Sequence, residues 1–247
     1  MWAYLSVVGQ EDALLPHAIR WFSHLGCRFR VIAYGDASVA GRIREVFKAH
    51  DTEFEDLGTY DVPYTKEHHY EVMRAAHNEG KWAFFLDLDE FPWITPEQLI
   101  QVRRDGRPLI GWPVDRTTHD GTLPVTNRNI PLEVQYPYGF QFDRQFHLHS
   151  SCIYVADNKV PADHYVENCD QGRKTMAELV KHAVEVHRFS WNDRLPIRAR
   201  QRLRELKQGE NYDPHGEVYW TALLEHLKWH QGVCPSIISF VGARLGI

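Results

Sequence analysis

The sequence predicts an α/β fold, in which a mostly parallel, Rossmann-like sheet carries helices on both faces. Through residues 1–108, short apolar segments alternate with segments whose apolar residues recur at helical spacing. The most apolar segment, WAFFL at 82–86, falls inside this alternation. Alternation of this kind is typical of a parallel sheet, because each parallel connection must cross a face of the sheet, usually as a helix.

The first element, WAYLSVV at 2–8, is a short apolar run typical of a buried strand, and a polar turn follows it. Apolar residues then recur at helical spacing over 14–25, before Gly26, a residue that favours a helix end. By the same criteria the sequence predicts further strands over 30–34, 53–57 and 82–86, and helices over 39–50, 68–79 and 96–103.

The second half of the chain has a different character. Residues 109–166 are rich in proline, glycine and aromatic residues. Apolar residues at mixed spacing over 176–187 are compatible with a helix, a strand or both. The sequence also predicts strand-like segments at 109–114, 139–146 and 151–155, an arginine-rich helix over 195–207 and an amphipathic helix over 217–229. We expect one main domain over residues 1–205 and a helical extension over 206–247.

The composition of the chain excludes several function classes. Its 247 residues are 43% hydrophobic and 25% charged, with a formal net charge of -5. An acidic chain is poorly suited to binding nucleic acid without sequence preference, which depends on many Lys and Arg side chains against phosphates. No run approaches the roughly 20 apolar residues that a membrane span needs, and the first residues lack the basic segment of a signal peptide. We therefore expect a soluble, cytoplasmic protein.

Two carboxylates directly follow the most apolar strand, in the segment FFLDLDEF at 84–91. Because side chains alternate along a strand, we expect Asp87 and Asp89 on one side and Leu88 in the core. Adjacent carboxylates repel each other unless a cation lies between them, and Mg²⁺ and Mn²⁺ prefer oxygen ligands. The segment therefore predicts a divalent metal that also binds a substrate phosphate. A solvated carboxylate pair at the strand exit is the alternative.

Four segments of the chain, taken in order, carry a resemblance to a known family. They are QEDALLPHAIRWFSHLGC at 10–27, VIAYGDAS at 31–38, FFLDLDEF at 84–91 and VEVHRFSW at 184–191. With them the chain resembles the metal-dependent glycosyltransferases of the nucleotide-diphosphosugar-binding (GT-A) fold, and most closely the family-2-like branch with an LDxDEF (DxD) signature. The chain departs from that branch at Gln10, where the branch has Asn, and at Arg188, where it has Tyr.

The resemblance implies a hexosyltransferase-like enzyme. It would move a sugar from a nucleotide diphosphosugar, with a UDP-sugar favoured, to an acceptor hydroxyl, with Mn²⁺ or Mg²⁺ as cofactor. Residues 1–108 would be the nucleotide-sugar-binding half and residues 109–190 the acceptor side. Asp87, Asp89 and His187 would hold the metal, and Asp87 would also bind the donor.

Other candidate residues follow from the same resemblance. Glu11 and Asp36, at the ends of the first two predicted strands, would bind the nucleotide, although turn or helix-capping carboxylates are an equally good interpretation. Asp143, in FQFDRQF, is the first candidate for the base that deprotonates the acceptor, because flanking aromatic rings could raise its pKa. An ion pair with Arg144, or a charge at a sheet edge, is its alternative. Further carboxylates in that stretch are Asp115, Asp120 and Glu133.

Six arginines lie between residues 188 and 204, against a single acid before residue 205, Asp193. Arg188 and Arg194 are the candidates for binding the donor diphosphate, and the cluster could also accept a phosphate-bearing acceptor. The alternative is a solvated basic helix face. General nucleic-acid binding is not expected.

Two other functions fit parts of the sequence. LDLDEF loosely resembles the strand motif of haloacid-dehalogenase-like phosphatases, but Glu90 follows it, and it lies after three predicted strand–helix units instead of near the start of the domain. A non-catalytic nucleotide-sugar-binding module is the second alternative, against which the presence of Asp87, Asp89 and His187 argues.

Overall fold

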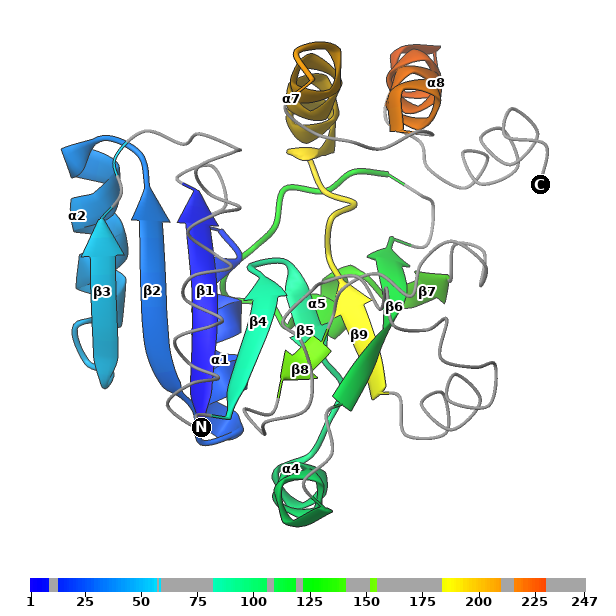
Figure 1. Cartoon of the computed structure of the whole chain (residues 1–247). Helices are drawn as coiled ribbons and strands as arrows, with labels where there is room; N and C mark the ends of the chain where they lie inside the picture. The colour runs from blue at the N-terminus through cyan, green and yellow to red at the C-terminus, as the bar shows by residue number, and fades with distance from the viewer. Residues whose placement is uncertain are drawn as a thin grey trace.

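A parallel sheet of four strands forms the N-terminal half of the protein in the computed structural model (Figure 1). The central strand β1 pairs with β2 on one side and with β4 on the other, and β3 lies at the edge beyond β2. These strands are β1 (Trp2–Val8), β2 (Arg28–Tyr34), β3 (Thr52–Asp56) and β4 (Ala83–Asp87). The predicted α/β fold with its parallel, Rossmann-like sheet is thus confirmed.

The structure describes most of the chain, and the statements below refer to that part. The described residues are 1–8, 13–56, 58, 82–105, 109–118, 122–140, 152–154, 184–209 and 216–229.

Two helices cover one face of this parallel sheet. They are α1 (Leu15–His24), which joins β1 to β2, and α2 (Ala37–Phe47), which joins β2 to β3 (Figure 1). Their buried faces form one core with β1, β2 and β4, in which the rings of Phe22 and Phe84 lie 5.5 Å apart. The predicted helix over 68–79 lies outside the described residues, so helices on the second face stay a prediction.

The sheet continues into a mixed second half. Beyond β4 the order is β8-β6-β9-β5, with β7 paired to β6. β6 and β9 are parallel, whereas β8, β5 and β7 pair antiparallel with their neighbours, so parallel pairing dominates only the N-terminal half. The strands are β5 (Glu90–Pro92), β6 (Leu109–Thr117), β7 (Tyr138–Phe140), β8 (Cys152–Tyr154) and β9 (Val184–Arg188).

Three helices that follow β4 in the sequence were predicted, and two short elements were not. The helices are α4 (Pro96–Asp105), α7 (Leu195–Lys207) and α8 (Gly216–Trp229). The sequence did not predict β5 or the single turn α5 (Leu132–Gln135), because neither is long enough to show a period. The end of the segment 176–187, which was compatible with a helix, a strand or both, lies in the strand β9.

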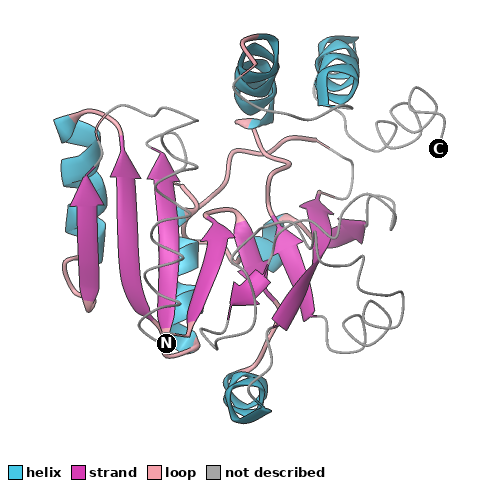
Figure 2. Ribbon diagram, viewed as in Figure 1, coloured by secondary structure: helices cyan, strands magenta, loops and turns pink. Residues whose placement is uncertain are grey.

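The helices α7 and α8 lie side by side at the end of the molecule toward which the parallel strands point, and α4 lies at the opposite end (Figure 2). The helices α7 and α8 share a small core of their own, which is made of Trp191, Leu195, Ala199, Ala222, Leu223 and Leu227. The expected domain boundary at residue 205 falls inside α7, and the division into two parts stays a prediction. No helix in the described part of the chain is long and apolar enough to span a membrane.

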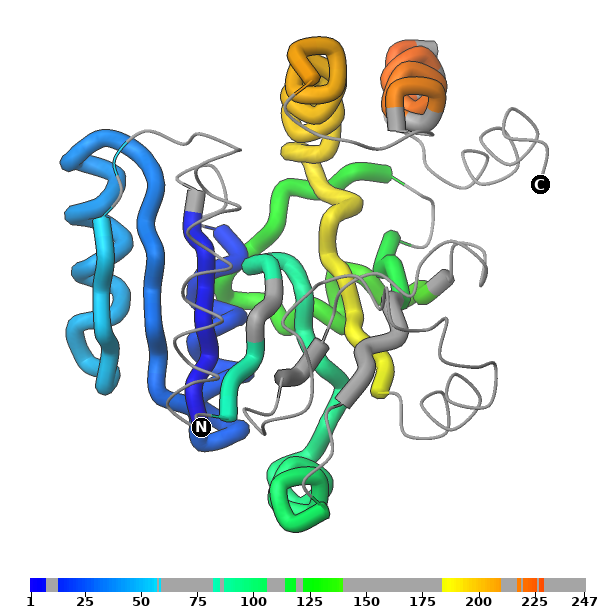
Figure 3. Tube along the Cα trace, in the orientation of Figure 1, coloured from blue at the N-terminus to red at the C-terminus, as the bar shows by residue number. Residues whose placement is uncertain are grey.

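Two segments that are far apart in the sequence meet below α7. Residues 122–127 and 189–194 run close together there (Figure 3), and the Asp193 N–H donates to the Pro124 carbonyl oxygen at 3.1 Å. This region lies at the carboxyl end of the parallel strands, where open α/β sheets bind their ligands.

Candidate functional site

The turn between β4 and β5 carries the predicted metal-binding motif. β4 ends at Asp87 and β5 begins at Glu90, so Leu88 and Asp89 form the turn itself. Leu88 is buried in the core, as predicted. Strand alternation does not extend to the second carboxylate, however: Asp87 is exposed, whereas Asp89 is buried.

Asp89 is held by side chains from the end of β9 and from α7. Its Oδ2 accepts hydrogen bonds from Ser190 Oγ at 2.6 Å and from Arg198 Nη1 at 2.7 Å. Its carbonyl oxygen accepts the Phe189 N–H at 2.9 Å. Burial opposes ionisation, but the charge of Arg198 and the bond from Ser190 outweigh it and lower the pKa of Asp89. Asp89 is therefore a buried carboxylate that stays ionised.

A second ion pair lies beside Asp89, between β6 and β9. Arg188 contacts both oxygens of Asp115, with Nη2 at 2.9 Å from each and Nε at 3.1 Å from Oδ1. The two residues are direct partners in the parallel β6–β9 register, and Glu90 is the partner of Arg188 across the β5–β9 register. The sequence analysis made Arg188 a candidate for binding the donor diphosphate. In the structure its guanidinium group pairs with Asp115. Burial raises the pKa of Asp115 despite this pair.

Glu90 is a further carboxylate of this region. It is buried, and its Oε2 accepts the Asp87 N–H at 3.3 Å. Burial and the negative charge of Asp87 raise the pKa of Glu90 well above its usual range. Four carboxylates (Asp87, Asp89, Glu90 and Asp115) therefore share this region with two guanidinium groups (Arg188 and Arg198), an arrangement that favours an additional cation or a protonated carboxyl.

His187 has different neighbours from the Asp89 group. Its Nε2 lies 3.0 Å from Glu185 Oε2, and its ring stacks on Trp93 with centroids 4.4 Å apart. Trp93 in turn stacks on Trp21 at 5.2 Å. Because successive side chains of β9 point to opposite faces, His187 and Arg188 are separated by the sheet. Burial lowers the pKa of His187.

The structure therefore brings Asp87, Asp89 and Arg188 into one region, together with Arg198, and places His187 elsewhere. In the described residues no group of three or more His, Cys, Asp or Glu side chains is arranged to hold a metal ion. Any divalent ion at the turn would depend on fewer protein ligands and on oxygens of a substrate, a pattern that Mg²⁺ tolerates.

Of the remaining predicted residues, two are described and two are not. Asp36 is the N-cap of α2, where its Oδ1 accepts the Val39 N–H at 2.9 Å, as the helix-capping interpretation expects. Arg194 precedes α7, half exposed, with its Nε 3.9 Å from Asp193 Oδ2. Glu11 and Asp143 lie outside the described residues.

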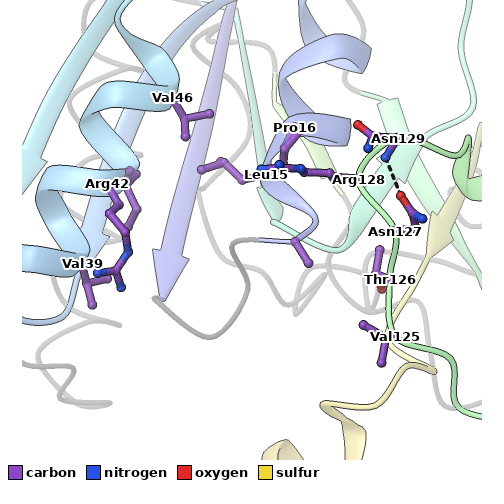
Figure 4. Close-up of a pocket in the computed structure, with 12 residues that line it drawn as sticks. Leu15, Pro16, Val39, Arg42, Val46, Val125, Thr126, Asn127, Arg128 and Asn129 are labelled. Atoms are coloured by element: carbon purple, nitrogen blue, oxygen red, sulfur yellow. Dashed lines mark hydrogen bonds between the residues drawn. The ribbon is translucent and has the colours of Figure 1, made fainter.

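An open cavity of about 670 Å³ lies between the start of α1, the length of α2 and residues 125–129 (Figure 4). Among the described residues that line it, Arg42 and Arg128 are the only charged ones. The loop is braced by the Asn129 N–H, which donates to Asn127 Oδ1 at 2.9 Å. The other lining residues are Ala13, Leu15, Pro16, Val39, Ile43, Val46, Val125 and Thr126.

A smaller cavity of about 40 Å³ lies next to the large one, toward the start of α7. It shares Ala13, Val125 and Thr126 with the large cavity. Its remaining lining residues are Leu14, Asn192, Asp193, Arg194 and Arg198. Arg198 lines this smaller cavity and also contacts Asp89.

Sequence reasoning missed the residues that organise this region. It predicted the arginine-rich helix, but it did not single out Arg198, and it did not identify Ser190 or the partner of Arg188. The i, i+4 spacing of Arg194, Arg198 and Arg202 in that helix was the available signal. The sequence could not identify Asp89 as the partner of Arg198, because the two residues are 109 positions apart.

Comparisons with known proteins give little beyond these observations. The sequence matches no protein-family model, and no curated protein matches it. Among solved structures, it is similar to the crystal structure of a proposed nucleotide-diphospho-sugar transferase from Desulfovibrio desulfuricans G20. The identity is 14%, the similarity covers 96% of each chain, and the TM-score is 0.36. A TM-score of this size does not establish a shared fold, so the proposals below rest on the residues of this chain.

Proposed function

We propose that the protein transfers a sugar from a nucleotide diphosphosugar, with a UDP-sugar favoured, to an acceptor hydroxyl. One observation carries the proposal: Asp89 is a buried, ionised carboxylate next to the exposed Asp87, at the carboxyl end of a parallel strand. Ligands of open α/β sheets bind at this end. Together with the resemblance of the surrounding LDLDEF segment to glycosyltransferases, this placement supports a donor site at the β4–β5 turn.

The residues at the turn fit a divalent cation, Mn²⁺ or Mg²⁺, held by Asp87 and Asp89. Both hydrogen bonds to the Asp89 carboxylate fall on Oδ2, and within the described residues Oδ1 accepts none. When bound, such an ion neutralises the charge of the leaving diphosphate. His187 was the third predicted ligand; its partners in this structure are Glu185 and Trp93.

The two cavities supply a place for the rest of the donor. The large cavity has a volume in the range of small-molecule sites, and its two arginines favour an anionic ligand. We propose that it takes the nucleotide, with Arg194 near the diphosphate and Asp36 at the start of α2. Glu11 as a nucleotide contact and Asp143 as the base for the acceptor remain part of the proposal, as does a phosphate-bearing acceptor.

The test is the isosteric substitution Asp89→Asn. It is expected to abolish Mn²⁺-dependent hydrolysis of the donor and to weaken UDP binding, because the carboxylate charge is lost while the side-chain volume is kept. The matched control is Asp105→Asn, an exposed carboxylate at the end of α4, at the far end of the molecule. Hydrolysis of a panel of UDP-, GDP-, ADP- and dTDP-sugars is measured with Mn²⁺ and with EDTA. Unchanged hydrolysis in Asp89→Asn, or a wild type that binds none of these sugars, would refute the proposal.

A further inference from the structure

We infer that Arg198 is a positioning residue, which orients the Asp89 carboxylate so that one defined oxygen meets the cation. The inference rests on the proposed function and adds to it a residue from α7, a helix that lies after the whole sheet in the sequence. Arg198 acts through its hydrogen bond to the Asp89 carboxylate.

The contacts of Arg198 tie three groups together. Its Nη1 donates to Asp89 Oδ2 at 2.7 Å, and its Nη2 donates to the Ser190 carbonyl oxygen at 2.7 Å and to Asn192 Oδ1 at 3.3 Å. Ser190 and Asn192 belong to the connection between β9 and α7, so the guanidinium links that connection to the β4–β5 turn.

The connection itself also binds Asp89. The Ser190 hydroxyl donates to the same Oδ2 at 2.6 Å, and the Phe189 N–H donates to the Asp89 carbonyl oxygen at 2.9 Å. The backbone and the side chain of Asp89 are therefore both held. Because two donors bind the same oxygen of the carboxylate, the orientation of the carboxylate is fixed. Its other oxygen therefore points in one direction.

The chemistry of the contacts requires an arginine. A planar guanidinium can donate in several fixed directions at once, whereas a lysine ammonium is a compact charge on a flexible stem. Arg198→Lys would keep the positive charge that favours ionised Asp89 but would lose the geometry that joins Asp89 to Ser190 and Asn192. A comparison of Arg198→Gln with Arg198→Lys therefore separates the effect of the positive charge at position 198 from the effect of the orientation of Asp89.

The matched control lies one helical turn further along α7. Arg202 is on the same helix, and its Nη1 lies 3.0 Å from Glu205 Oε2. Arg202→Gln removes an arginine and an ion pair from α7 without touching a contact of Asp89. Ser190→Ala removes the second donor to Oδ2 and leaves Arg198 in place.

The readout is the affinity of the full-length protein for Mn²⁺ alone, measured by electron paramagnetic resonance. Residues that orient a metal ligand typically change metal affinity by about 10- to 100-fold when they are replaced. We expect a loss in this range for Arg198→Gln, smaller losses for Arg198→Lys and Ser190→Ala, and a change within about twofold for Arg202→Gln. Unfolding in urea is measured on every variant, because a merely structural role would lower stability and leave the affinity unchanged.

The outcomes separate this inference from the proposed function. If the wild type binds Mn²⁺ and UDP-sugars and Arg198→Gln and Arg198→Lys bind Mn²⁺ as tightly as the wild type, the positioning role is wrong and the transfer reaction stands. A wild type that binds UDP-sugars without Mn²⁺ also overturns the inference alone. A wild type that binds neither overturns the proposed function. Should Arg198→Gln fail to fold, Arg198→Lys and Ser190→Ala decide the question.

Discussion

The two halves of the sheet bury different kinds of side chain. Within the described residues 1–56, His17 is the only buried residue of polar or charged type, and the other buried residues are of hydrophobic type. The described residues from 82 onward bury seven: Asp89, Glu90, Asp115, Thr126, His187, Asn192 and Glu205.

The difference shows how the protein separates stability from its candidate chemistry. Burial of apolar side chains stabilises the parallel half without any partner of defined geometry. A buried charge is tolerated only when it is paired and hydrogen-bonded, so the second half depends on individual contacts such as those of Asp89 and Asp115. The candidate site lies where these contacts gather. Substitutions in the two halves should therefore differ in their effects on stability and on ligand binding.

The largest expected effect is in the second half. Arg188→Met leaves Asp115 buried without its bidentate partner, and we expect it to lower the free energy of unfolding by about 3–5 kcal/mol. Combining it with Asp115→Leu should recover most of the loss, because an apolar pair replaces an uncompensated charge. Urea unfolding of the single and double variants measures both. A loss below about 1 kcal/mol, the size of a surface pair, would show that Arg188 and Asp115 are not effectively buried.

In the parallel half, a substitution that creates a cavity should lower the free energy of unfolding slightly less, and it should leave the candidate site intact. Leu5 lies in the middle of β1 with 1% of its surface exposed. We expect Leu5→Ala to lower the free energy of unfolding by about 2–5 kcal/mol, through lost burial and the cavity left behind. Binding of Mn²⁺ and UDP-sugars to the folded protein should stay within about twofold of the wild type. Calorimetric titration below the unfolding temperature checks this, and a larger change in affinity would mean that the two halves are coupled.

The smallest expected effect concerns His17, the exception in the parallel half. Burial lowers the pKa of His17 from 6.5, although the Asn127 carbonyl oxygen, 3.1 Å from Nε2, opposes the shift. Well above pH 6.5 the ring is neutral in both states and contributes no pH dependence. As the pH falls below that value the unfolded chain binds the proton more readily, so folding becomes less stable.

Replacing His17 should therefore reduce the loss of stability on acidification. We expect the unfolding free energy of His17→Gln to fall less between pH 7 and pH 5 than that of the wild type, in parallel urea titrations. His24→Gln, at an exposed position of the same helix, is the control. An equal decline in the wild type and in His17→Gln would show that other groups carry the acid sensitivity.

The strands and helices of the first half were predictable because their signals are local. The apolar run at 2–8 became β1 with the same ends, and the helical spacing over 14–25 became α1 (Leu15–His24). The arginine-rich segment 195–207 likewise became α7. Each depends on the spacing of apolar residues within about one element, which the sequence displays directly.

The candidate site was predictable only in part. The position of Asp87 at the end of β4 and the burial of Leu88 followed from the apolar run before them. The separation of His187 from Arg188 did not, because adjacency in a motif suggested one site while β9 turns neighbours to opposite faces. The metal, the donor and the roles of Glu11 and Asp143 stay predictions.

By itself, the sequence determined that this protein builds a parallel sheet and that two aspartates follow its most apolar strand. Only the tertiary structure decided which charges meet: Arg198 with Asp89, and Arg188 with Asp115. The physical reason is that a periodic apolar pattern acts within a few residues, whereas the partner of a buried charge is chosen by the packing of elements about 70 to 110 residues apart.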